Sequence, residues 1–152
     1  MNMRLRFPWL PVIALALAAC GGDDDESYTL QKGPFLLVDR ERLAFDTEFD
    51  RGTYVGAASR NSLYIENRGD QPLEITAVVK NAPSEFVLRL PDALAAGGTL
   101  TIESRKTALI EAEFTPKQAK TYEGSFILKS NAANAPEKEI GLVGVGVTPP
   151  PP

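Results

Sequence analysis

Short apolar runs with a two-residue period fill the sequence from residue 28 onward and limit the folds that it can form. Leu63 and Ile65, for example, alternate with Tyr64 and Glu66. Side chains at i and i+2 of a strand lie on one face, so each run has one apolar face to bury. The other runs are 73–77, 86–90, 100–102, 110–114, 122–129 and 140–147, with shorter ones at 35–38 and 43–45. We expect about seven to eight strands and no long helix.

Turn-forming residues separate these runs, which favours two packed sheets. The turn segments are rich in Gly, Asn, Pro and Asp and span 67–70, 81–83, 96–98 and 131–134. A strand with one apolar face must hide that face against a second sheet. We therefore predict an all-β fold in which residues 28–148 form a single immunoglobulin-like β-sandwich, followed by a proline-rich tail at 149–152.

The first nineteen residues have the layout of an export signal rather than of a domain. Arg4 and Arg6 precede an apolar run, 7–19, and small residues lead to Cys20. A helix that spans a bilayer needs about 20 apolar residues, and this run is shorter. Residues 1–19 are therefore predicted to be removed after export.

Leu17, Ala18, Ala19 and Cys20 resemble the bacterial lipobox, in which small residues precede a cysteine. The resemblance implies that the Cys20 thiol receives a diacylglycerol, that cleavage occurs just before Cys20, and that the new amine is acylated as well. The lipid would hold the protein on a membrane surface without crossing it. The alternative is an ordinary secretory signal that happens to contain a cysteine.

Residues 20–27 are expected to form an acidic tether between the lipid and the sandwich. Two glycines follow Cys20, and Asp23, Asp24, Asp25 and Glu26 then stand side by side. A calcium loop would space its ligands at alternating positions, so a solvated, extended segment is favoured over a metal site. In the lipoprotein family, an aspartate directly after the cysteine retains some members in the inner membrane. Gly21 stands there instead, which favours the outer membrane, on its periplasmic face or at the cell surface.

The charge balance excludes one class of partner. Without Arg4 and Arg6 the chain keeps 14 basic and 20 acidic residues, a formal charge of −6. An acidic chain without a basic stripe has no electrostatic attraction to nucleic acid. Cys20 is also the single cysteine, so the sandwich has no internal disulfide and depends on packing.

Several motifs, taken in order, resemble the Hydin/ASH type of immunoglobulin-like domain, which also occurs in bacterial "choice-of-anchor D" lipoproteins and is related to the major-sperm-protein sandwich. One motif is the loop ENRGDQPL, in which Asn67, Gly69, Pro72 and Leu73 occupy the characteristic positions. The other motifs lie at 43–45, 86–88, 110–116, 128–131 and 140–146. The resemblance implies a fold and a tendency to bind or scaffold proteins. It implies no shared catalytic residue and no fixed ligand.

The same loop contains Arg68, Gly69 and Asp70, a tripeptide known as a ligand of animal adhesion receptors. A turn is the favoured interpretation. Gly69 can take a positive φ, and Asn67 and Asp70 can hydrogen-bond to nearby backbone. Pro72 then sets the entry to the next strand. An adhesion role remains the alternative.

Catalytic chemistry finds little support in the sequence. The chain has no histidine, and its one cysteine is assigned to lipid, so the usual proton shuttle, thiolate nucleophile and soft-metal ligands are missing. Glu111 and Glu113 lie at i and i+2 of a strand and are expected on the solvent side. The glycines of 141–146 look superficially like a phosphate loop, but they lie inside a strand pattern and are expected to let that strand pack closely. We expect no catalytic residue, no metal and no cofactor other than the Cys20 lipid.

The sequence thus predicts a lipid-anchored protein of the bacterial cell envelope that is not an enzyme. Its sandwich is expected to act as a protein-binding or structural module, through a sheet edge or end loops, with a protein partner of unknown identity. Two alternatives stay open, a cell-wall or carbohydrate-binding lipoprotein and a chaperone-like periplasmic factor.

Overall fold

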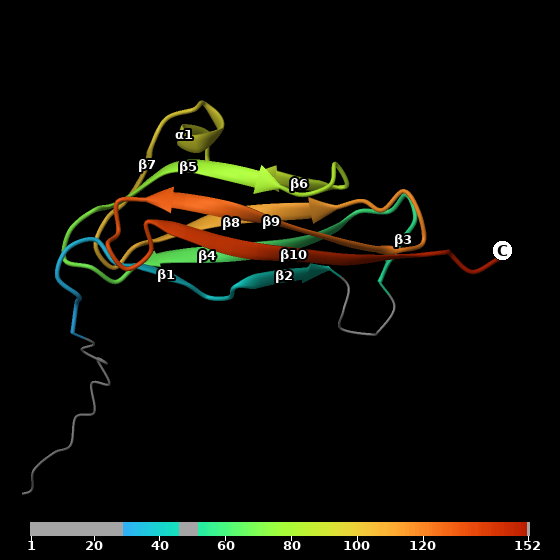
Figure 1. Cartoon of the computed structure of the whole chain (residues 1–152), viewed down its shortest axis with the longest axis horizontal. Coiled ribbons are helices and arrows are strands. Elements are labelled where there is room, and N and C mark those ends of the chain that lie inside the picture. The colour runs from blue at the N-terminus through green and yellow to red at the C-terminus, as the bar shows by residue number, and fades with distance from the viewer. Residues whose placement is uncertain (1–28, 46–51, 152) are drawn as a thin grey trace, which may run out of the picture.

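The computed structural model describes residues 29–45 and 52–151, which form two β-sheets packed face to face (Figure 1). The prediction of an all-β, immunoglobulin-like sandwich is confirmed. In chain order the elements are β1 (Leu36–Val38), β2 (Arg42–Phe45), β3 (Thr53–Tyr54), β4 (Ser59–Asn67), β5 (Leu73–Asn81), β6 (Phe86–Arg89), α1 (Asp92–Ala95), β7 (Leu100–Ile102), β8 (Thr107–Phe114), β9 (Thr121–Ser130) and β10 (Glu137–Val147).

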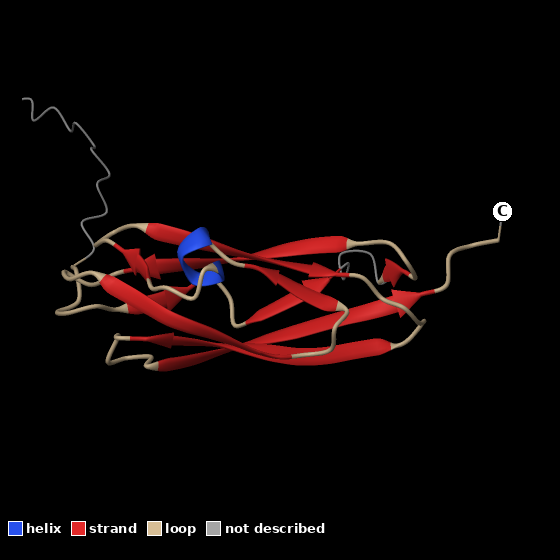
Figure 2. Cartoon of the chain, turned by 90° about the horizontal axis from the view of Figure 1, so that it is seen from above, coloured by secondary structure: helices blue, strands red, loops and turns tan. Residues whose placement is uncertain are grey.

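One sheet has the strand order β1-β4-β8-β6, and the other has the order β2-β10-β9-β5-β7. The chain passes from one sheet to the other at seven of its connections, and two of these join an edge strand of one sheet to an edge strand of the other. The short helix α1 lies on the crossing from β6 to β7 (Figure 2). The other crossing follows β1, which pairs antiparallel with β4, whereas β2 pairs parallel with β10. The two short runs expected at 35–38 and 43–45 therefore lie in different sheets.

The described residues contain ten strands, more than the seven to eight expected. Every run identified in the sequence forms a strand. The one described strand that corresponds to none of these nine runs is β3, which has only two residues and whose register pairs Thr53 with Gly146 and Tyr54 with Val147 of β10. Two residues cannot show an alternating pattern, so β3 depends on its partner strand rather than on a signal of its own.

Four aromatic rings join the two sheets at the centre of the core. Phe86 and Phe114 belong to the four-stranded sheet, and Phe45 and Tyr122 come from the facing sheet. Phe114 lies between the other three, with ring centroids 4.8 Å from Phe86, 5.6 Å from Phe45 and 5.4 Å from Tyr122. Burial of such a side chain contributes about 1.5–3 kcal/mol. The cluster therefore fixes how the sheets face one another.

Gly144 of β10 faces this cluster and must lack a side chain. A Cβ at this position would lie 2.5 Å from Cε1 of Phe114, well inside van der Waals contact. The expectation that the β10 glycines permit close packing is confirmed here. All the glycines of 141–146 lie within one continuous strand.

Tyr122 also fastens the turn that leads into β9. Its hydroxyl oxygen accepts hydrogen bonds from the backbone N–H groups of Gln118, at 3.0 Å, and Lys117, at 3.3 Å. A tyrosine near the start of this strand, bonded to backbone a few residues upstream, is a recurrent feature of immunoglobulin-like sandwiches. No pattern in the sequence separately indicates this contact.

Replacing Gly144 with valine should destabilise the sandwich, because the new side chain must displace the Phe114 ring. We expect the free energy of unfolding to fall by about 1–3 kcal/mol, the usual cost of overpacking a core. Urea unfolding of the purified protein measures this change. Gly141→Ala is the matched control, since a Cβ there meets nothing closer than 3.6 Å. Equal loss in the two variants would contradict the packing role of Gly144.

Candidate functional site

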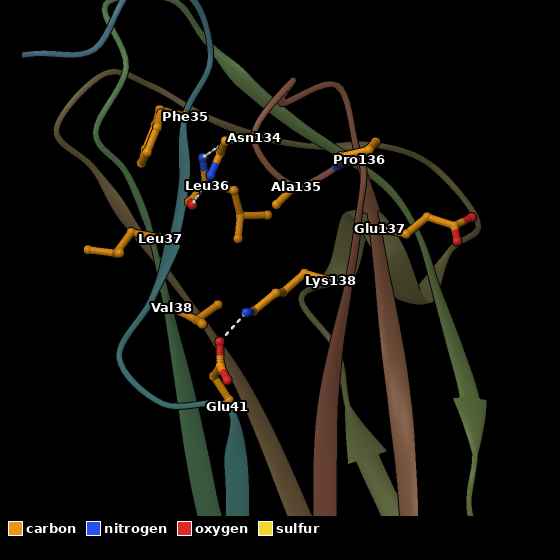
Figure 3. A pocket seen from close by; sticks show the side chains of 10 residues that line it. All are labelled: Phe35, Leu36, Leu37, Val38, Glu41, Asn134, Ala135, Pro136, Glu137 and Lys138. Carbon is orange, nitrogen blue, oxygen red and sulfur yellow. Dashed lines mark hydrogen bonds and ion pairs between the residues drawn. The ribbon is translucent and has the colours of Figure 1, made fainter.

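A groove of about 470 Å³ separates β1 from the start of β10 (Figure 3). One wall is made by β1 and its neighbours, and the other wall comes from the β9–β10 turn and the first residues of β10. The groove exists because β1 stays with β4 while β2 moves to β10, so the sheets separate at this edge. The lining residues are Phe35, Leu36, Leu37, Val38, Glu41, Asn134, Ala135, Pro136, Glu137 and Lys138.

Along β1, the backbone N–H and C=O groups of alternate residues face this groove. Arg68 N–H donates to the Phe35 carbonyl at 3.0 Å, and Asp39 N–H donates to the Tyr64 carbonyl at 3.2 Å. Residues 35 and 39 therefore direct their backbone groups at β4. Because an antiparallel ladder alternates, the backbone groups of Leu36 and Val38 point the other way, along the open edge.

Asn134 occupies the position that a partner strand would take beside Leu36. Its amide oxygen accepts from Leu36 N–H at 3.0 Å, and its amide nitrogen donates to the Leu36 carbonyl at 2.8 Å. Both contacts are drawn in Figure 3. Neither backbone group of Val38 has a hydrogen-bond partner in the part of the chain that the structure describes. The edge is thus closed at Leu36 and open at Val38.

The same kind of closure occurs on β2. The side-chain amide of Asn61, on β4, donates to the Ala44 carbonyl at 2.6 Å. Exposed strand edges are sites of unwanted pairing, and proteins commonly block them. Asparagine side chains thus block the edge on β1 and on β2, the two strands joined by this crossing. The open position is therefore confined to Val38.

An ion pair lies beside Val38 in the groove. The Lys138 ammonium group donates a hydrogen bond to the Glu41 carboxylate, and this bond together with the lysine charge lowers the pKa of Glu41. Figure 3 shows the two side chains reaching toward each other across the groove. Lys138 and Glu41 come from the two facing walls, so their contact links the walls at this point.

Three exposed apolar side chains lie next to the groove on the outer face of the four-stranded sheet. Tyr64 on β4 lies directly opposite Leu109 on β8. Leu37 on β1 lies opposite Glu66, which is two residues along β4 from Tyr64 and therefore on the same face of the sheet. Their exposed fractions are 49%, 39% and 37%. Leu37 also lines the groove, so the apolar surface continues from the groove onto the face of the sheet. We call Leu37, Tyr64 and Leu109 the apolar patch.

The fold-marker loop is organised around Asn67, whose side chain is fully buried. Its amide oxygen accepts from Gly69 N–H at 2.9 Å and from Phe35 N–H at 3.3 Å. Its amide nitrogen donates to the carbonyls of Gln71, at 2.7 Å, and Ile102, at 2.9 Å. A single side chain thus ties together the approach to β1, the loop after β4 and the end of β7.

Gly69 lies in this loop for a reason different from the expected one. The positive φ angles of described glycines occur at Gly33, Gly52, Gly56 and Gly97, and Gly69 does not share this conformation. A Cβ on Gly69 would instead lie 1.9 Å from the Gly33 carbonyl oxygen. Close approach of two backbone segments therefore explains the glycine.

The flanking residues of the tripeptide are engaged within the domain. The Arg68 guanidinium pairs with Glu66 at 3.1 Å, and an Asp70 carboxylate oxygen accepts from Gly33 N–H at 2.6 Å. Pro72 is exposed, and Leu73 is buried at the start of β5. These contacts agree with the interpretation of the loop as a turn.

The remaining predicted sites are of two kinds. Cys20 and the lipobox residues Leu17, Ala18 and Ala19 lie outside the described residues, as does the segment 20–27. Glu113 lies on the outer face of β8, where Arg89 and Arg60 each donate to it at 2.9 Å and lower its pKa. Such a carboxylate is a structural ion-pair partner rather than a proton acceptor.

Residues 29–45 and 52–151 lack two further kinds of feature. No group of three or more potential ligands is arranged to hold a metal ion there. The same residues include no helix with the length and apolar character needed to cross a bilayer.

No family model matches the chain, and no curated protein matches it. Solved structures do resemble it. The ASH / PapD-like domain 7 of human CEP192 is 14% identical with a TM-score of 0.57, over 94% of this chain and 100% of that chain. A protein of unknown function from Porphyromonas gingivalis W83 is 14% identical with a TM-score of 0.56, over 79% of this chain and 50% of that chain. The chain therefore shares the immunoglobulin-like sandwich fold of this ASH / PapD-like domain.

The sandwich also resembles part of a much longer enzyme. The VesB protease of Vibrio cholerae is 17% identical with a TM-score of 0.50, over 71% of this chain but only 31% of the protease. Identities this low show a shared fold and carry no activity from one protein to another.

Replacing Asn67 with aspartate should destabilise the domain strongly. The change keeps the shape of the side chain but sets a carboxylate oxygen against the carbonyls of Gln71 and Ile102. We expect a loss of about 3 kcal/mol or more, since a buried charge and unpaired carbonyls are both unfavourable. Chemical denaturation measures the loss. Asn81→Asp, at an exposed position, is the control and should change stability by less than about 0.5 kcal/mol. Similar effects in the two variants would contradict the role given to Asn67.

Proposed function

We propose that this protein is a lipid-anchored component of the bacterial cell envelope whose sandwich binds an extended segment of a partner protein along β1. The observation that carries the proposal is the open backbone position at Val38, set in a groove and continued by the apolar patch. Unpaired N–H and C=O groups on a strand edge accept another strand, and neighbouring pockets select its side chains.

The geometry favours a polypeptide over other occupants. A backbone donor and acceptor from one residue match the alternating groups of an extended chain. The groove beside them is lined by both apolar and polar side chains, and the patch offers Leu37, Tyr64 and Leu109 to apolar side chains of a partner. Pairing beyond Val38 requires the partner to displace Asn134 from Leu36, which exchanges two hydrogen bonds for two others. The cost of lengthening the contact is therefore small.

The membrane anchor is supported by the sequence. A basic start, an apolar run and the lipobox residues Leu17, Ala18, Ala19 and Cys20 occur in the order that lipoproteins require. Acyl chains on Cys20 contribute about 0.8 kcal/mol for each buried CH₂, so two or three chains give durable attachment. Gly21 favours the outer membrane. Lipid on Cys20 is the one covalent group that the proposal requires, and no cofactor takes part.

The groove would lie near the anchored end of the domain. The described chain begins at residue 29 at the same end of the sandwich as β1, and the C-terminal tail leaves from the opposite end (Figure 1). Nine residue steps separate Cys20 from Thr29 and span at most about 30 Å. A partner bound along β1 would therefore be held close to the membrane surface.

Crosslinking in the intact envelope tests the binding site. A photoreactive amino acid at Leu37, which lines the groove, should give reproducible adducts with another protein. The same probe at Val79, which is similarly exposed on the other sheet, should not. Val38→Pro removes the open N–H donor, and proline is tolerated on edge strands. This change should reduce the Leu37 adducts severalfold while circular dichroism stays unchanged.

Three results would contradict the proposed site. They are equal adducts at the two probe positions, adducts that Val38→Pro leaves unaltered, and the absence of protein adducts at Leu37. Sedimentation of the protein with purified peptidoglycan, combined with an absence of protein adducts, would favour a cell-wall binder instead.

Lipidation is tested separately. Cys20→Ala should abolish incorporation of radiolabelled palmitate and release the protein from the membrane fraction, because the alanine has no thiol to acylate. Ser27→Ala, at the end of the acidic tether, is a control that should leave labelling unchanged. Continued labelling of the Cys20→Ala protein would show that the lipobox interpretation is wrong.

A further inference from the structure

Three cationic side chains gather at the end of the sandwich where the described chain begins. Lys32, Arg105 and Lys106 are all exposed. Gln31 pairs with Gly69 across a β-bridge, which places Lys32 beside the fold-marker loop. Asn67 N–H donates to the Lys106 carbonyl at 3.0 Å, and Arg105 N–H donates to the Asn67 carbonyl at 2.9 Å. We call Lys32, Arg105 and Lys106 the cationic end.

The cationic end keeps a net positive charge. None of its three side chains forms an ion pair with a residue that the structure describes. Of the nearby acids, Glu66 pairs with Arg68, and Asp70 accepts from Gly33 N–H. Glu103, in the same turn as Arg105, is exposed and offsets one of the three positive charges. Asp70 keeps its negative charge when it accepts from a backbone N–H, so it offsets a second positive charge. One net positive charge is left at this end, in a chain whose overall charge is negative.

Arg105 occupies an unusual backbone conformation for its type. Its φ of 63° lies in the left-handed region, and it is the one non-glycine residue with a positive φ among those described. Glycine or asparagine adopts this conformation more readily, and other residues there cost about 1 kcal/mol or more. Hydrogen bonds hold the turn, from Arg105 N–H to Asn67 and from Lys106 N–H to the Glu103 carbonyl at 3.0 Å. An arginine here adds charge at a position where backbone preference alone favours glycine.

We propose that the acidic segment 23–26 of the same chain pairs with the cationic end. These four acids stand three to six residues before Thr29, the first described residue. Glu26 is six residues from Lys32, and six extended residues reach about 20 Å. Gln31 and Arg105 donate to the consecutive carbonyls of residues 68 and 67, so the turn of Arg105 and Lys106 lies beside Lys32 and within this reach. Charge complementarity and covalent linkage both favour this occupant over a separate molecule.

Such pairing would shorten the tether and hold the sandwich near the surface to which Cys20 is attached. This consequence rests on the proposed lipid anchor, whereas the pairing itself does not. High salt or a divalent cation would weaken the pairing and let the tether extend, since exposed ion pairs are strongly screened. The acidic segment would then set how far the β1 groove stands from the membrane.

The single cysteine provides the test. The chain from Cys20 onward, produced without acylation, is labelled at Cys20 with a nitroxide, and amide signals are followed by NMR. We expect strong paramagnetic broadening at residues 32 and 105–106 in about 0.01 M salt, and a severalfold loss of broadening in about 1 M salt, where the screening length is about 3 Å. A chain carrying D23N, D24N, D25N and E26Q should show the weaker broadening at both salt concentrations.

A matched pair of charge reversals separates local pairing from overall charge. Replacing Lys32, Arg105 and Lys106 with glutamate should reduce the broadening as the neutral tether does. Replacing Lys80, Lys117 and Lys120 with glutamate changes the net charge equally and should leave the broadening at residues 32 and 105–106 intact. Broadening that responds neither to salt nor to the first triple substitution would overturn the proposal.

Anionic lipid is the competing occupant, and vesicles of phosphatidylglycerol distinguish it. If the acidic segment covers the cationic end, the unacylated chain should bind these vesicles weakly, and neutralising the tether should increase binding severalfold. Equally tight binding with the native and the neutral tether would identify lipid headgroups as the occupant and overturn the pairing. Neither outcome depends on acylation, so a failure here is distinct from a failure of the lipidation test.

Discussion

The buried amide of Asn67 is the interaction on which this end of the molecule depends. Its four hydrogen bonds join the approach to β1, the loop after β4 and the end of β7, and its backbone groups bind residues 105 and 106. The side chain is wholly removed from water, so each of these bonds would leave an unpaired group if it were lost. Asn67 therefore positions the start of β1, which forms one wall of the groove. It also positions the cationic end.

The groove follows from a topological choice rather than from a specialised insertion. Because β1 remains with β4 and β2 joins β10, an edge opens between the sheets. Asn134 and Asn61 close much of this edge by imitating a neighbouring strand. What stays open is one backbone position, Val38, with an apolar patch beside it. The binding that we propose for this edge requires backbone hydrogen bonds and apolar contacts and no catalytic group.

The fold could be predicted from the sequence because its signals are local and repeated. Strict alternation located every long strand, and the glycines of β10 correctly indicated close packing. The groove could not be predicted, because it depends on which sheet β1 joins and which sheet β2 joins. A strand shows the same alternation of apolar and polar residues in either sheet. Asn134 was visible only as a turn residue, and nothing nearby in the sequence indicates its contact with Leu36, 98 positions away. Gly69 was correctly assigned to a turn, but the expected reason, a positive φ, was wrong. The actual reason is the close approach of Gly33, which is distant in the sequence.

Amide hydrogen exchange at β1 tests the central claim most directly. In the purified protein, Leu36 N–H is bonded to Asn134, the N–H of Leu37 faces β4, and the N–H of Val38 faces the groove without a partner. Our account predicts slow exchange at Leu36 and Leu37 and fast exchange at Val38. If the Val38 amide is protected as strongly as those of Leu36 and Leu37, the edge is already closed. That result would contradict a strand-binding role for this groove.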